Sequence, residues 1–331
     1  MDKDIFSPVV LPEERIIESS LRPKSLEDFI GQERVKAQLD IFLRASIKRG
    51  ETLDHVLFYG PPGLGKTTLA YIVSSELKVP IQVTSGPAIE KAGELVAILT
   101  SLDEGSVLFI DEIHRLGKSV EEILYPAMEE REIDIVIGKG TGARAIRIRL
   151  PRFTLIGATT RFGLISPPLR DRFGIVERLD YYSPEEILKI IERAAKILNI
   201  KYEKGALREI SFRARGTPRI ANRIIKRIRD YSDVKGDGFV SRSLALEALA
   251  LFEIEEHGLD REDIRILETI AYKFGGGPVG IETLSSAIGE SAETIEEIYE
   301  PYLIKMGYIE RTPRGRTITE NGLEILKGKA R

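Results

Sequence analysis

Short apolar runs alternate with amphipathic stretches through the first 180 residues. The apolar runs predict β-strands at 55–59, 81–84, 106–111, 153–159 and 175–179. Between them, apolar residues recur with the helical period and predict helices near 66–77, 90–101 and 118–130. Strands that alternate with helices in this way form parallel sheets, so the predicted fold is a doubly wound α/β domain.

A further amphipathic stretch precedes the first strand. It begins at Gln32 and places Val35, Leu39, Phe42 and Leu43 on one face of a predicted helix.

The segment between the third helix and the fourth main strand predicts a β-hairpin at 133–149. Apolar residues alternate with polar ones on both sides of a glycine-rich turn: Ile133, Ile135 and Ile137 before it, and Ile146, Ile148 and Leu150 after it. We interpret this as a hairpin inserted into the sheet domain. Isoleucines exposed on a protruding hairpin would need a partner to cover them, whereas an ordinary sheet edge would not.

The pattern changes near residue 181. Ser183 followed by Pro184 is typical of a helix start, and the chain then reads as helical to about residue 252. After an acidic stretch and the break at 275–278, short helices are predicted at 281–287, 291–300 and 301–306. Two strand-like pieces then flank a Pro-Arg-Gly tip, which favours a winged helix-turn-helix.

These changes predict four parts. Residues 1–20 form a mobile N-terminal arm, 21–180 the sheet domain, 181–254 a small α-helical domain, and 255–331 a winged-helix domain.

The most specific motif is GPPGLGKTT at residues 60–68, between a predicted strand and a predicted helix. Glycines let the backbone bend closely around phosphates, and the N–H groups that begin the helix have no intrahelical partner and attract anions. The pattern matches a phosphate-binding loop, with the lysine reaching the β/γ-phosphates and the first threonine on Mg²⁺. The residues predicted to bind nucleotide here are Gly60, Pro61, Gly63, Gly65, Lys66, Thr67 and Thr68.

The predicted strand at 106–111 ends in two consecutive acids, Asp111 and Glu112. Ligands bind at the carboxyl ends of strands in open α/β sheets, so Asp111 is predicted to hold Mg²⁺ and Glu112 to act as general base toward water. The motifs together indicate a Mg-dependent ATPase. At the end of the next strand, either Thr160 or Thr159 could orient the water, although a strand-end cap is an open alternative.

Two arginines, Arg170 and Arg172, follow that strand. Arginine can neutralise charge that develops on a transferring phosphoryl group, but a salt bridge to Asp171 or a neighbour is the simpler alternative.

Composition narrows the choice of function. The chain has 331 residues, 42% hydrophobic and 31% charged, with a net charge of −3, which excludes a uniformly basic nucleic-acid-binding protein. It has no cysteine and three dispersed histidines, which argues against disulfides and thiolate metal sites. No apolar run is long enough for a membrane span and no signal-peptide pattern opens the chain, so we expect a cytoplasmic location.

A local basic footprint remains possible at the C-terminus. Residues 301–331 carry seven Lys/Arg against three Glu. Arg311, Arg314 and Arg316 around the wing tip predict phosphate contacts to DNA, with a solvated basic tail as the alternative.

Taken together, these motifs resemble those of AAA+ ATPases. They include the loop at 60–68, the Asp-Glu-Ile-His box at 111–114, Gly-Ala-Thr-Thr-Arg at 157–161, Leu-Arg-Asp-Arg-Phe-Gly at 169–174 and Gly-Thr-Pro-Arg at 216–219. The sequences at 111–116 and at 311–316 are similar to those of the RuvB family, the ATPases that drive branch migration of Holliday junctions in recombination and repair. The resemblance covers nearly the whole chain after the N-terminal arm.

The resemblance assigns roles in the sheet domain. It implies that Lys66 and Thr67 form Walker A, that Asp111 and Glu112 form Walker B, and that Thr160 is sensor one. Arg172 would be an arginine finger acting on ATP in a neighbouring subunit, with Arg170 as the second candidate. One departure is Pro167, where we expect Ser or Thr before Pro-Leu-Arg; it should stiffen the turn.

The resemblance also implies a second sensor, further residues of the nucleotide pocket and the residues that contact DNA. Arg219 would be sensor two, and Leu21, Arg22, Tyr182 and Pro218 would belong to the nucleotide pocket. Arg311, Arg314 and Arg316 would contact DNA.

The partners implied by the resemblance are further subunits in a ring, expected to be a hexamer, together with duplex DNA and the four-way junction. The 133–149 hairpin would dock on the junction-binding protein RuvA, and RuvC is a further partner of such a motor. Two other ATPase classes stay open at this point: a nucleotide-gated DNA-binding module of the initiator type, and a clamp-loader-like or protein-remodelling ATPase.

Overall fold

The computed structural model describes residue 5, residues 20–137 and residues 144–329. The arm predicted at 1–20 falls almost entirely outside the described residues, and the hairpin turn at 138–143 falls wholly outside them. The chain divides into two compact units. One is Arg22–Asp180, and the other joins Met1–Leu21 to Tyr181–Arg331.

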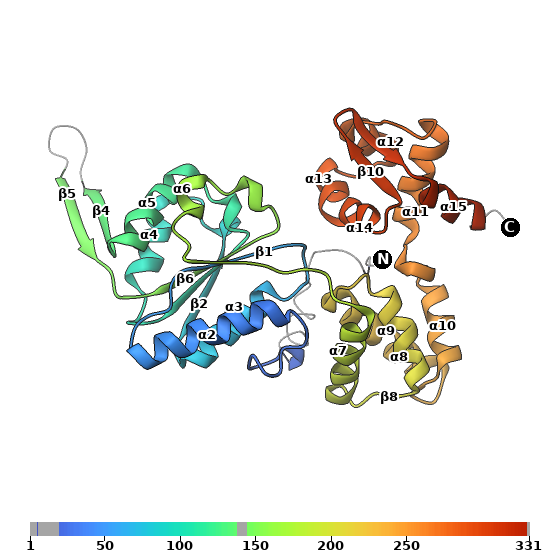
Figure 1. The fold of residues 1–331 in the computed structure, drawn as a ribbon, viewed down its shortest axis with the longest axis horizontal. Helices are drawn as coiled ribbons and strands as arrows, with labels where there is room; N and C mark the ends of the chain where they lie inside the picture. The colour runs from blue at the N-terminus through green and yellow to red at the C-terminus, as the bar shows by residue number, and fades with distance from the viewer. Residues whose placement is uncertain (1–4, 6–19, 138–143, 330–331) are drawn as a thin grey trace. The chain divides into compact units, whose positions relative to one another are not determined.

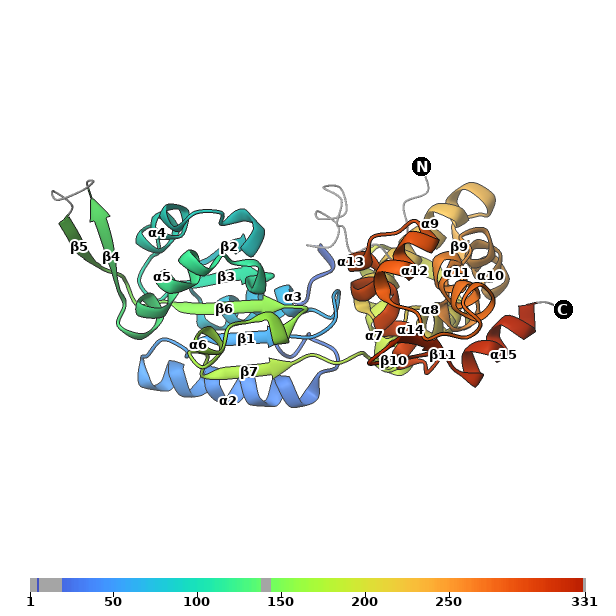
Figure 2. The same ribbon diagram turned by 90° about the horizontal axis from the view of Figure 1, so that it is seen from above.

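The first unit is an α/β domain, as the alternating pattern predicted. Its elements are α2 (Glu33–Arg49), β1 (Val56–Tyr59), α3 (Lys66–Leu77), β2 (Ile81–Ser85), η1 (Gly86–Ala88), α4 (Ala92–Thr100), β3 (Val107–Asp111), η2 (Ile113–Arg115), α5 (Lys118–Glu129), β4 (Glu132–Ile137), β5 (Arg144–Arg149), β6 (Thr154–Thr159), η4 (Phe162–Leu164), α6 (Pro167–Arg170) and β7 (Ile175–Arg178). Five strands form one sheet in the order β2-β3-β6-β1-β7 (Figure 2), and all four pairings are parallel.

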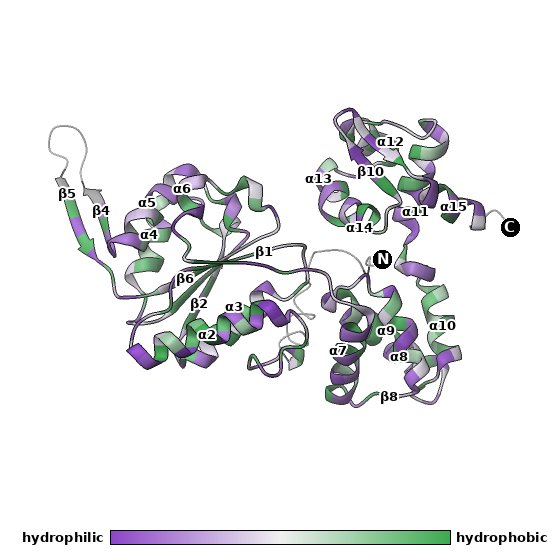
Figure 3. Ribbon diagram, viewed as in Figure 1, coloured by the Kyte–Doolittle hydropathy of each residue, from purple (hydrophilic) through white to green (hydrophobic). Residues whose placement is uncertain are grey.

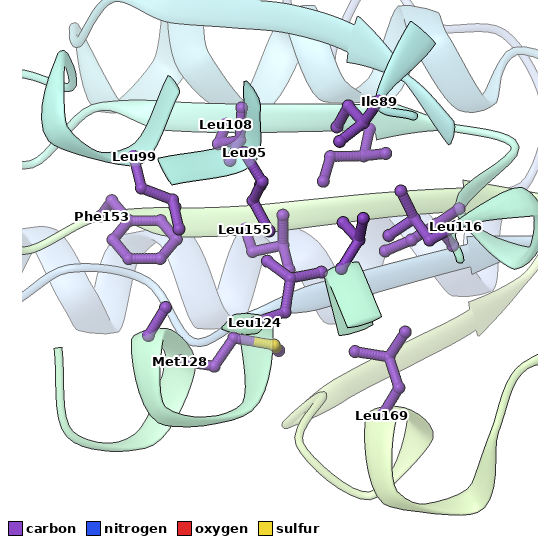
Figure 4. Close-up of a cluster of buried hydrophobic side chains, with 14 of the residues drawn as sticks. Ile89, Leu95, Leu99, Leu108, Leu116, Leu124, Met128, Phe153, Leu155 and Leu169 are labelled. Atoms are coloured by element: carbon purple, nitrogen blue, oxygen red, sulfur yellow. The ribbon is translucent and has the colours of Figure 1, made fainter. Parts of the chain in front are cut away.

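Helices cover both faces of this sheet (Figure 1). On one face, side chains from α4, α5 and α6 meet apolar residues of the strands in a continuous core that includes Leu95, Leu124, Leu155 and Leu169 (Figure 4). In Figure 3 the central strands are hydrophobic, whereas the helices around them carry residues of both kinds. A parallel sheet buried on both faces requires such runs of apolar residues.

Helix α2 follows its predicted pattern with one correction. Val35, Leu39 and Leu43 are buried, but Phe42 is 38% exposed. Phe42 lies at the edge of the apolar stripe, and the small Ser46 takes the buried position one turn further along.

The predicted hairpin exists as a separate antiparallel pair of strands, β4 and β5, outside the main sheet. The expectation of exposed isoleucines is wrong at its base, because Ile133 is buried in the domain core and Ile148 packs against that core. Among the hairpin side chains that the structure describes, Ile146 is the exposed isoleucine, at 47%. Next to it in sequence, Arg147 forms ion pairs with Glu132 and Asp134 of the other strand.

The second unit begins with the small helical domain. Its elements are α7 (Pro184–Ile197), β8 (Lys201–Tyr202), α8 (Lys204–Arg213), α9 (Pro218–Lys235), β9 (Phe239–Val240) and α10 (Arg242–Leu251). Ser183 caps α7 in a capping box with Glu186, as the Ser-Pro start predicted. The prediction of a purely helical segment missed β8 and β9, whose two residues each pair in parallel and are too short to show a period.

The winged helix follows in the same unit. Its elements are η5 (Glu256–Gly258), α11 (Arg261–Glu268), η6 (Thr269–Lys273), α12 (Ile281–Ile288), α13 (Ala292–Thr294), η7 (Ile295–Tyr299), α14 (Glu300–Lys305), β10 (Ile309–Thr312), β11 (Gly315–Ile318) and α15 (Glu320–Lys329). β10 and β11 form the antiparallel wing, and Val279 adds a bridge to Arg316.

The predicted helix break at residue 300 is wrong. The chain stays helical from α13 through α14, because a π-helical turn, η7, precedes Pro301 and accommodates a residue that cannot donate an N–H. Within the described residues, no helix combines the length and apolarity needed to cross a bilayer.

Candidate functional site

The loop between β1 and α3 has the backbone of a phosphate cradle. Gly60, Gly63 and Gly65 have φ values of +136°, +78° and +106°, which L side chains rarely adopt. A Cβ on Gly60 would also lie 2.3 Å from the carbonyl oxygen of Leu179, so the loop can lie against the end of β7 only because this residue is glycine.

Helix α3 begins at Lys66, and Gly65 provides no side-chain cap for its first N–H groups. Those groups and the helix dipole therefore favour an anion at this end. The Lys66 ammonium is buried and donates to the carbonyl oxygens of Gly60, at 2.7 Å, and Pro61, at 2.9 Å. A lysine held on its own loop in this way lies beside the position that the phosphates of a nucleotide would take.

Sheet order brings the other predicted catalytic residues to the same edge. β6 lies between β3 and β1, so Thr159 and Thr160 at its end lie between the acids after β3 and the loop after β1. Tyr59 pairs with Thr159, and the N–H of Gly60 donates to the Thr159 carbonyl at 3.2 Å. Residues from three separate segments thus meet at the carboxyl end of the sheet.

Glu112 is fixed in an unusual conformation. Its backbone is left-handed, with φ of 47° and ψ of 48°, and its N–H donates to Oδ1 of Asp111 at 3.0 Å. Its Oε2 accepts from the N–H of Thr160, at 3.3 Å, and from Oγ1 of Thr160, at 3.1 Å. A non-glycine residue in this backbone region is an uncommon feature that often marks functional sites.

His114 holds the same carboxylate from another side. Its Nδ1 lies 3.2 Å from Oε2 of Glu112 and 2.8 Å from Oγ1 of Thr159. Burial acts to raise the pKa of Glu112, but hydrogen bonds from His114 and Thr160 and the charge of Lys66 outweigh it and leave that pKa below its usual value. The carboxylate is therefore ionised at neutral pH, as a general base must be.

The two candidate finger residues differ in environment. The Arg172 guanidinium donates to the Pro168 carbonyl at 2.6 Å and to Glu129 at 3.1 Å, and lies 4.5 Å from the ring centroid of Tyr125. Its side chain is 21% exposed. The guanidinium of Arg170 lies instead over Phe162, at 5.3 Å.

The turn that carries these arginines is capped and contains prolines. Ser166 caps α6 by accepting from the N–H of Leu169, and Pro167 occupies the first helical position, which fixes the backbone there. Ser166 also donates to Glu121 at 2.6 Å. The hydroxyl residue expected at 167, Ser or Thr, is thus present one residue earlier, as Ser166.

The remaining nucleotide-pocket candidates lie in both units. Arg22 is in the first, where its guanidinium lies 4.7 Å from the ring centroid of Tyr71. Leu21, Tyr182, Pro218 and Arg219 are in the second. There, Leu21 accepts a hydrogen bond from Arg193 through its carbonyl, Tyr182 donates its N–H to Gly216, and Pro218 and Arg219 begin α9.

The three wing arginines prove unequal. Arg314 is exposed at the tip, and Arg311 is 60% exposed beside Glu296. Arg316 is 6% exposed and binds Glu300 and Glu296, each at 2.8 Å. Because its guanidinium is enclosed by two carboxylates, Arg316 differs from the expectation of a DNA contact and instead ties the wing to the helix that precedes it.

Family models match the sheet domain, the small helical domain and the winged helix. Family models described as the Holliday junction DNA helicase RuvB P-loop domain, the RuvB AAA lid domain and the RuvB C-terminal winged helix domain match residues 21–179, 182–255 and 256–327. The chain belongs to the RuvB family.

Relatives of the RuvB family agree over nearly the full length. The Holliday junction branch migration complex subunit RuvB of Dehalococcoides mccartyi (strain CBDB1) is 54% identical over 315 residues, which cover 95% of this chain and 90% of that protein. The solved structure of the Thermotoga maritima RuvB Holliday junction branch migration motor matches with a TM-score of 0.85 and 50% identity, over 93% of this chain and 98% of that one. A variant of that protein with one lysine replaced by arginine matches with a TM-score of 0.86.

RuvB membership decides between the ATPase classes left open by the sequence. The chain is an AAA+ P-loop ATPase of the branch-migration type, with a lid and a winged helix, and the initiator and clamp-loader alternatives fall away.

The sequence reasoning overlooked two residues of this RuvB-type site. His114 was read only as part of a motif, although its place two residues after Glu112 could have suggested a contact with that carboxylate. Glu129, the partner of Arg172, lies 43 positions away in sequence and carries no local signal.

Proposed function

We propose that this chain is an ATP-driven motor that moves Holliday junctions by drawing duplex DNA through a ring of identical subunits, in recombination and repair. The observation that carries the proposal is the meeting of the phosphate loop, Glu112 and Thr160 at one sheet edge, in a RuvB-family chain that ends in a winged helix. A nucleotide-binding and hydrolysing site is thereby joined to a DNA-binding domain in one polypeptide.

The residues of the first unit fit a Mg²⁺-nucleotide. The glycine backbone and α3 would hold the phosphates, Lys66 would leave its loop carbonyls for the β/γ-phosphates, and Thr67 and Asp111 would supply oxygen ligands to Mg²⁺. When bound, Mg²⁺ would neutralise charge on the phosphate oxygens. The hydroxyl and carboxylate of these two residues are the hard ligands that this ion prefers.

In the proposed mechanism Glu112 receives a proton from the attacking water while Thr160 fixes the orientation of that carboxylate. Because the pKa of Glu112 is lowered, its carboxylate is ionised and can accept the proton. Arg172 of an adjoining subunit would complete the site by stabilising the negative charge of the transition state. Its bond to Glu129 would hold the guanidinium in place until a nucleotide competes for it.

Further residues would contact the nucleotide or report its state. By family membership we assign Arg219 to sensor two, and Leu21, Arg22, Tyr182 and Pro218 to the pocket around base and ribose. Arg314 and Arg311 would contact DNA phosphates, since both are exposed, while Arg316 would support the wing from within.

The finer partner assignments also belong to this proposal. They are a ring of six subunits on DNA, docking of the 133–149 hairpin on RuvA, an association with RuvC, and a cytoplasmic location. The exposed Ile146 supports the hairpin assignment, because an apolar side chain on a projecting strand gains from being covered.

The deciding experiment is ATP-driven migration of a synthetic four-way junction by the purified chain, with and without purified RuvA. We expect migration that requires ATP and Mg²⁺ and increases with RuvA. The Lys66→Ala variant, which should bind ATP poorly, is the control for contaminating activity. If the chain hydrolyses ATP on junction DNA but never moves the junction under either condition, the proposal is wrong.

A further inference from the structure

A buried arginine joins the small helical domain to the winged helix within the second unit. Arg215 lies in the turn between α8 and α9, with a left-handed backbone (φ 55°), and its side chain is 3% exposed. Its Nε donates to the carbonyl oxygen of Gly258 at 2.7 Å. Its Nη2 donates to Asp260 at 3.0 Å and also to Asp263.

The two aspartates are themselves part of the start of the winged helix. Asp260 caps α11 and forms a capping box with Asp263: the N–H of Asp263 donates to Asp260 at 2.8 Å, and the N–H of Asp260 donates to Asp263 at 3.0 Å. The Arg215 guanidinium also lies 4.9 Å from the ring centroid of Tyr302 in α14. One side chain of the helical domain therefore contacts two helices of the winged helix.

The backbones on either side of Arg215 are in close contact as well. A Cβ on Gly258 would lie 2.4 Å from the Arg213 carbonyl oxygen, and a Cβ on Gly216 would lie 2.6 Å from that of Tyr182 and 3.2 Å from Nζ of Lys305. Both glycines have positive φ, so a side chain would be strained there even with space. Of these contacts, those of Gly258 with Arg213 and of Lys305 with Gly216 place the winged helix directly against this turn.

The buried ion pairs of Arg215 make a strong and directional connection between the helical domain and the winged helix. Removing one partner of a buried ion pair leaves the other charge desolvated and unpaired, which is far more costly than breaking an exposed pair. Arginine's planar fork fixes the angle as well as the distance between the groups it joins. An apolar contact of the same area would allow the two domains to slide.

The position of the link in the chain gives it a consequence. Arg215 is followed directly by Gly216, Thr217, Pro218 and Arg219, the segment that begins α9. We propose that Arg215 is a positioning residue that clamps the winged helix to the start of α9, so that a movement of this segment on nucleotide turnover is delivered to the DNA-binding wing. The inference rests on the proposed function for what the movement does, but the clamp itself can be tested apart from it.

The first test measures rigidity. The chain has no cysteine, so spin labels can be placed at Val234→Cys in α9 and Tyr272→Cys in η6, both at exposed positions. We expect one narrow distance distribution by pulsed electron spin resonance in the otherwise unchanged chain, and a clearly broadened one with Arg215→Met and Asp263→Asn combined. The pair of changes removes the guanidinium together with the fully buried Asp263 carboxylate, so that of the two aspartates only Asp260, whose side chain is 12% exposed, is left without its arginine. An amide oxygen at 263 can still accept the Asp260 N–H.

Two further variants complete this test. Arg213→Met removes a guanidinium that binds Glu209 of its own helix, and should leave the distribution narrow. Arg215→Lys keeps the positive charge but loses the planar guanidinium, and should broaden the distance distribution. It replaces the double variant if the double variant unfolds at too low a temperature. Narrow distributions in every folded Arg215 variant would overturn the clamp.

The second test measures coupling. In the Arg215→Met, Asp263→Asn protein we expect ATP binding and DNA binding to be retained while the ATP hydrolysed per junction migrated rises by about tenfold, within the usual range of coupling between sites. An unchanged ratio would contradict the inference. If the unchanged protein fails to migrate junctions, the proposed function fails, and the distance measurement still decides whether the clamp exists.

Discussion

Thr160 and Glu112, at the ends of two neighbouring strands, are joined by two hydrogen bonds. Both the N–H and the hydroxyl of Thr160 donate to the same carboxylate oxygen, at 3.3 Å and 3.1 Å. The carboxylate is therefore oriented by β6, although it belongs to the turn after β3. A base that is oriented before substrate arrives needs no rearrangement at the moment of reaction.

We expect Thr160→Val to lower kcat for ATP hydrolysis by about 10²-fold, comparable to the loss of one positioned donor in other enzymes. Valine keeps the size of threonine but cannot donate. ATP affinity should stay within a few-fold, because the phosphate loop is untouched. Steady-state hydrolysis and binding of a fluorescent nucleotide check the two parts.

Thr160→Ser is the matched control and should keep most of the activity, since its hydroxyl can reach the same oxygen. A fully active Thr160→Val protein would show that this hydrogen bond has no part in catalysis.

Arg172→Ala should bind ATP and fail to hydrolyse it, with a loss of about 10³-fold or more, because transition-state charge would stay uncompensated. Arg170→Ala, which removes a guanidinium lying over Phe162, should have the smaller effect. Hydrolysis rates for the two variants under saturating ATP make the comparison.

Mixing variants tests whether Arg172 acts between subunits. Arg172→Ala has an intact phosphate loop and Lys66→Ala has an intact finger, so mixed rings should recover activity that neither protein shows alone. No recovery, in mixtures shown to assemble together, would place the role of Arg172 within its own chain.

The wing arginines should separate into two classes. Arg314→Ala should reduce the slope of log DNA affinity against log salt by about one, as one phosphate contact is lost, with no change in thermal stability.

Arg316→Ala should instead destabilise the winged helix by about 3–5 kcal/mol, because it leaves Glu300 buried without its main partner. Denaturant unfolding and DNA titrations at several salt concentrations measure both effects. A stable Arg316→Ala protein with a reduced salt slope would return Arg316 to the DNA surface.

Stability of the α/β unit should fall as the pH drops below about 6.5, the ordinary pKa of histidine. His55 accepts the Leu155 N–H at Nδ1, at 2.9 Å, and its Nε2 lies 3.2 Å from the Met128 carbonyl oxygen. Burial lowers the pKa of His55, against an opposing hydrogen bond to Met128. Below about pH 6.5 His55 is protonated in the unfolded chain but stays neutral in the folded one. Lowering the pH through this range therefore lowers the free energy of unfolding.

Hydrogen exchange of amides on β1 and β6 across pH 5–8, corrected for intrinsic rates, measures this. His55→Gln should flatten the pH dependence, while His257→Asn, at an exposed position in the other unit, is the reference variant. Equal slopes in the unchanged chain and the His55→Gln variant would exclude His55 as the source.

The candidate catalytic residues that the sequence predicts lie in short motifs whose chemistry is local. The glycines around Lys66 have the unusual backbone angles that a phosphate-binding loop requires, and Asp111 and Glu112 stand at the end of a buried strand. The residues that were missed act across the fold. His114 meets Glu112 through a turn, Glu129 meets Arg172 from another helix, and Glu296 and Glu300 enclose Arg316, which the sequence had assigned to DNA.

By itself, the sequence determined the parallel α/β fold, the nucleotide chemistry and the winged helix, because periodicity and loop motifs depend on neighbours a few residues away. Only the tertiary structure decided which charged side chains are exposed to a partner and which are buried in ion pairs within the chain. Arg314 and Arg316 stand two residues apart in the same wing, yet one is exposed and the other is buried between carboxylates. Arg215 likewise looks like any arginine in the sequence, and only its enclosure by Asp260 and Asp263 assigns it a role. Burial and pairing depend on residues distant in the chain, which no local pattern records.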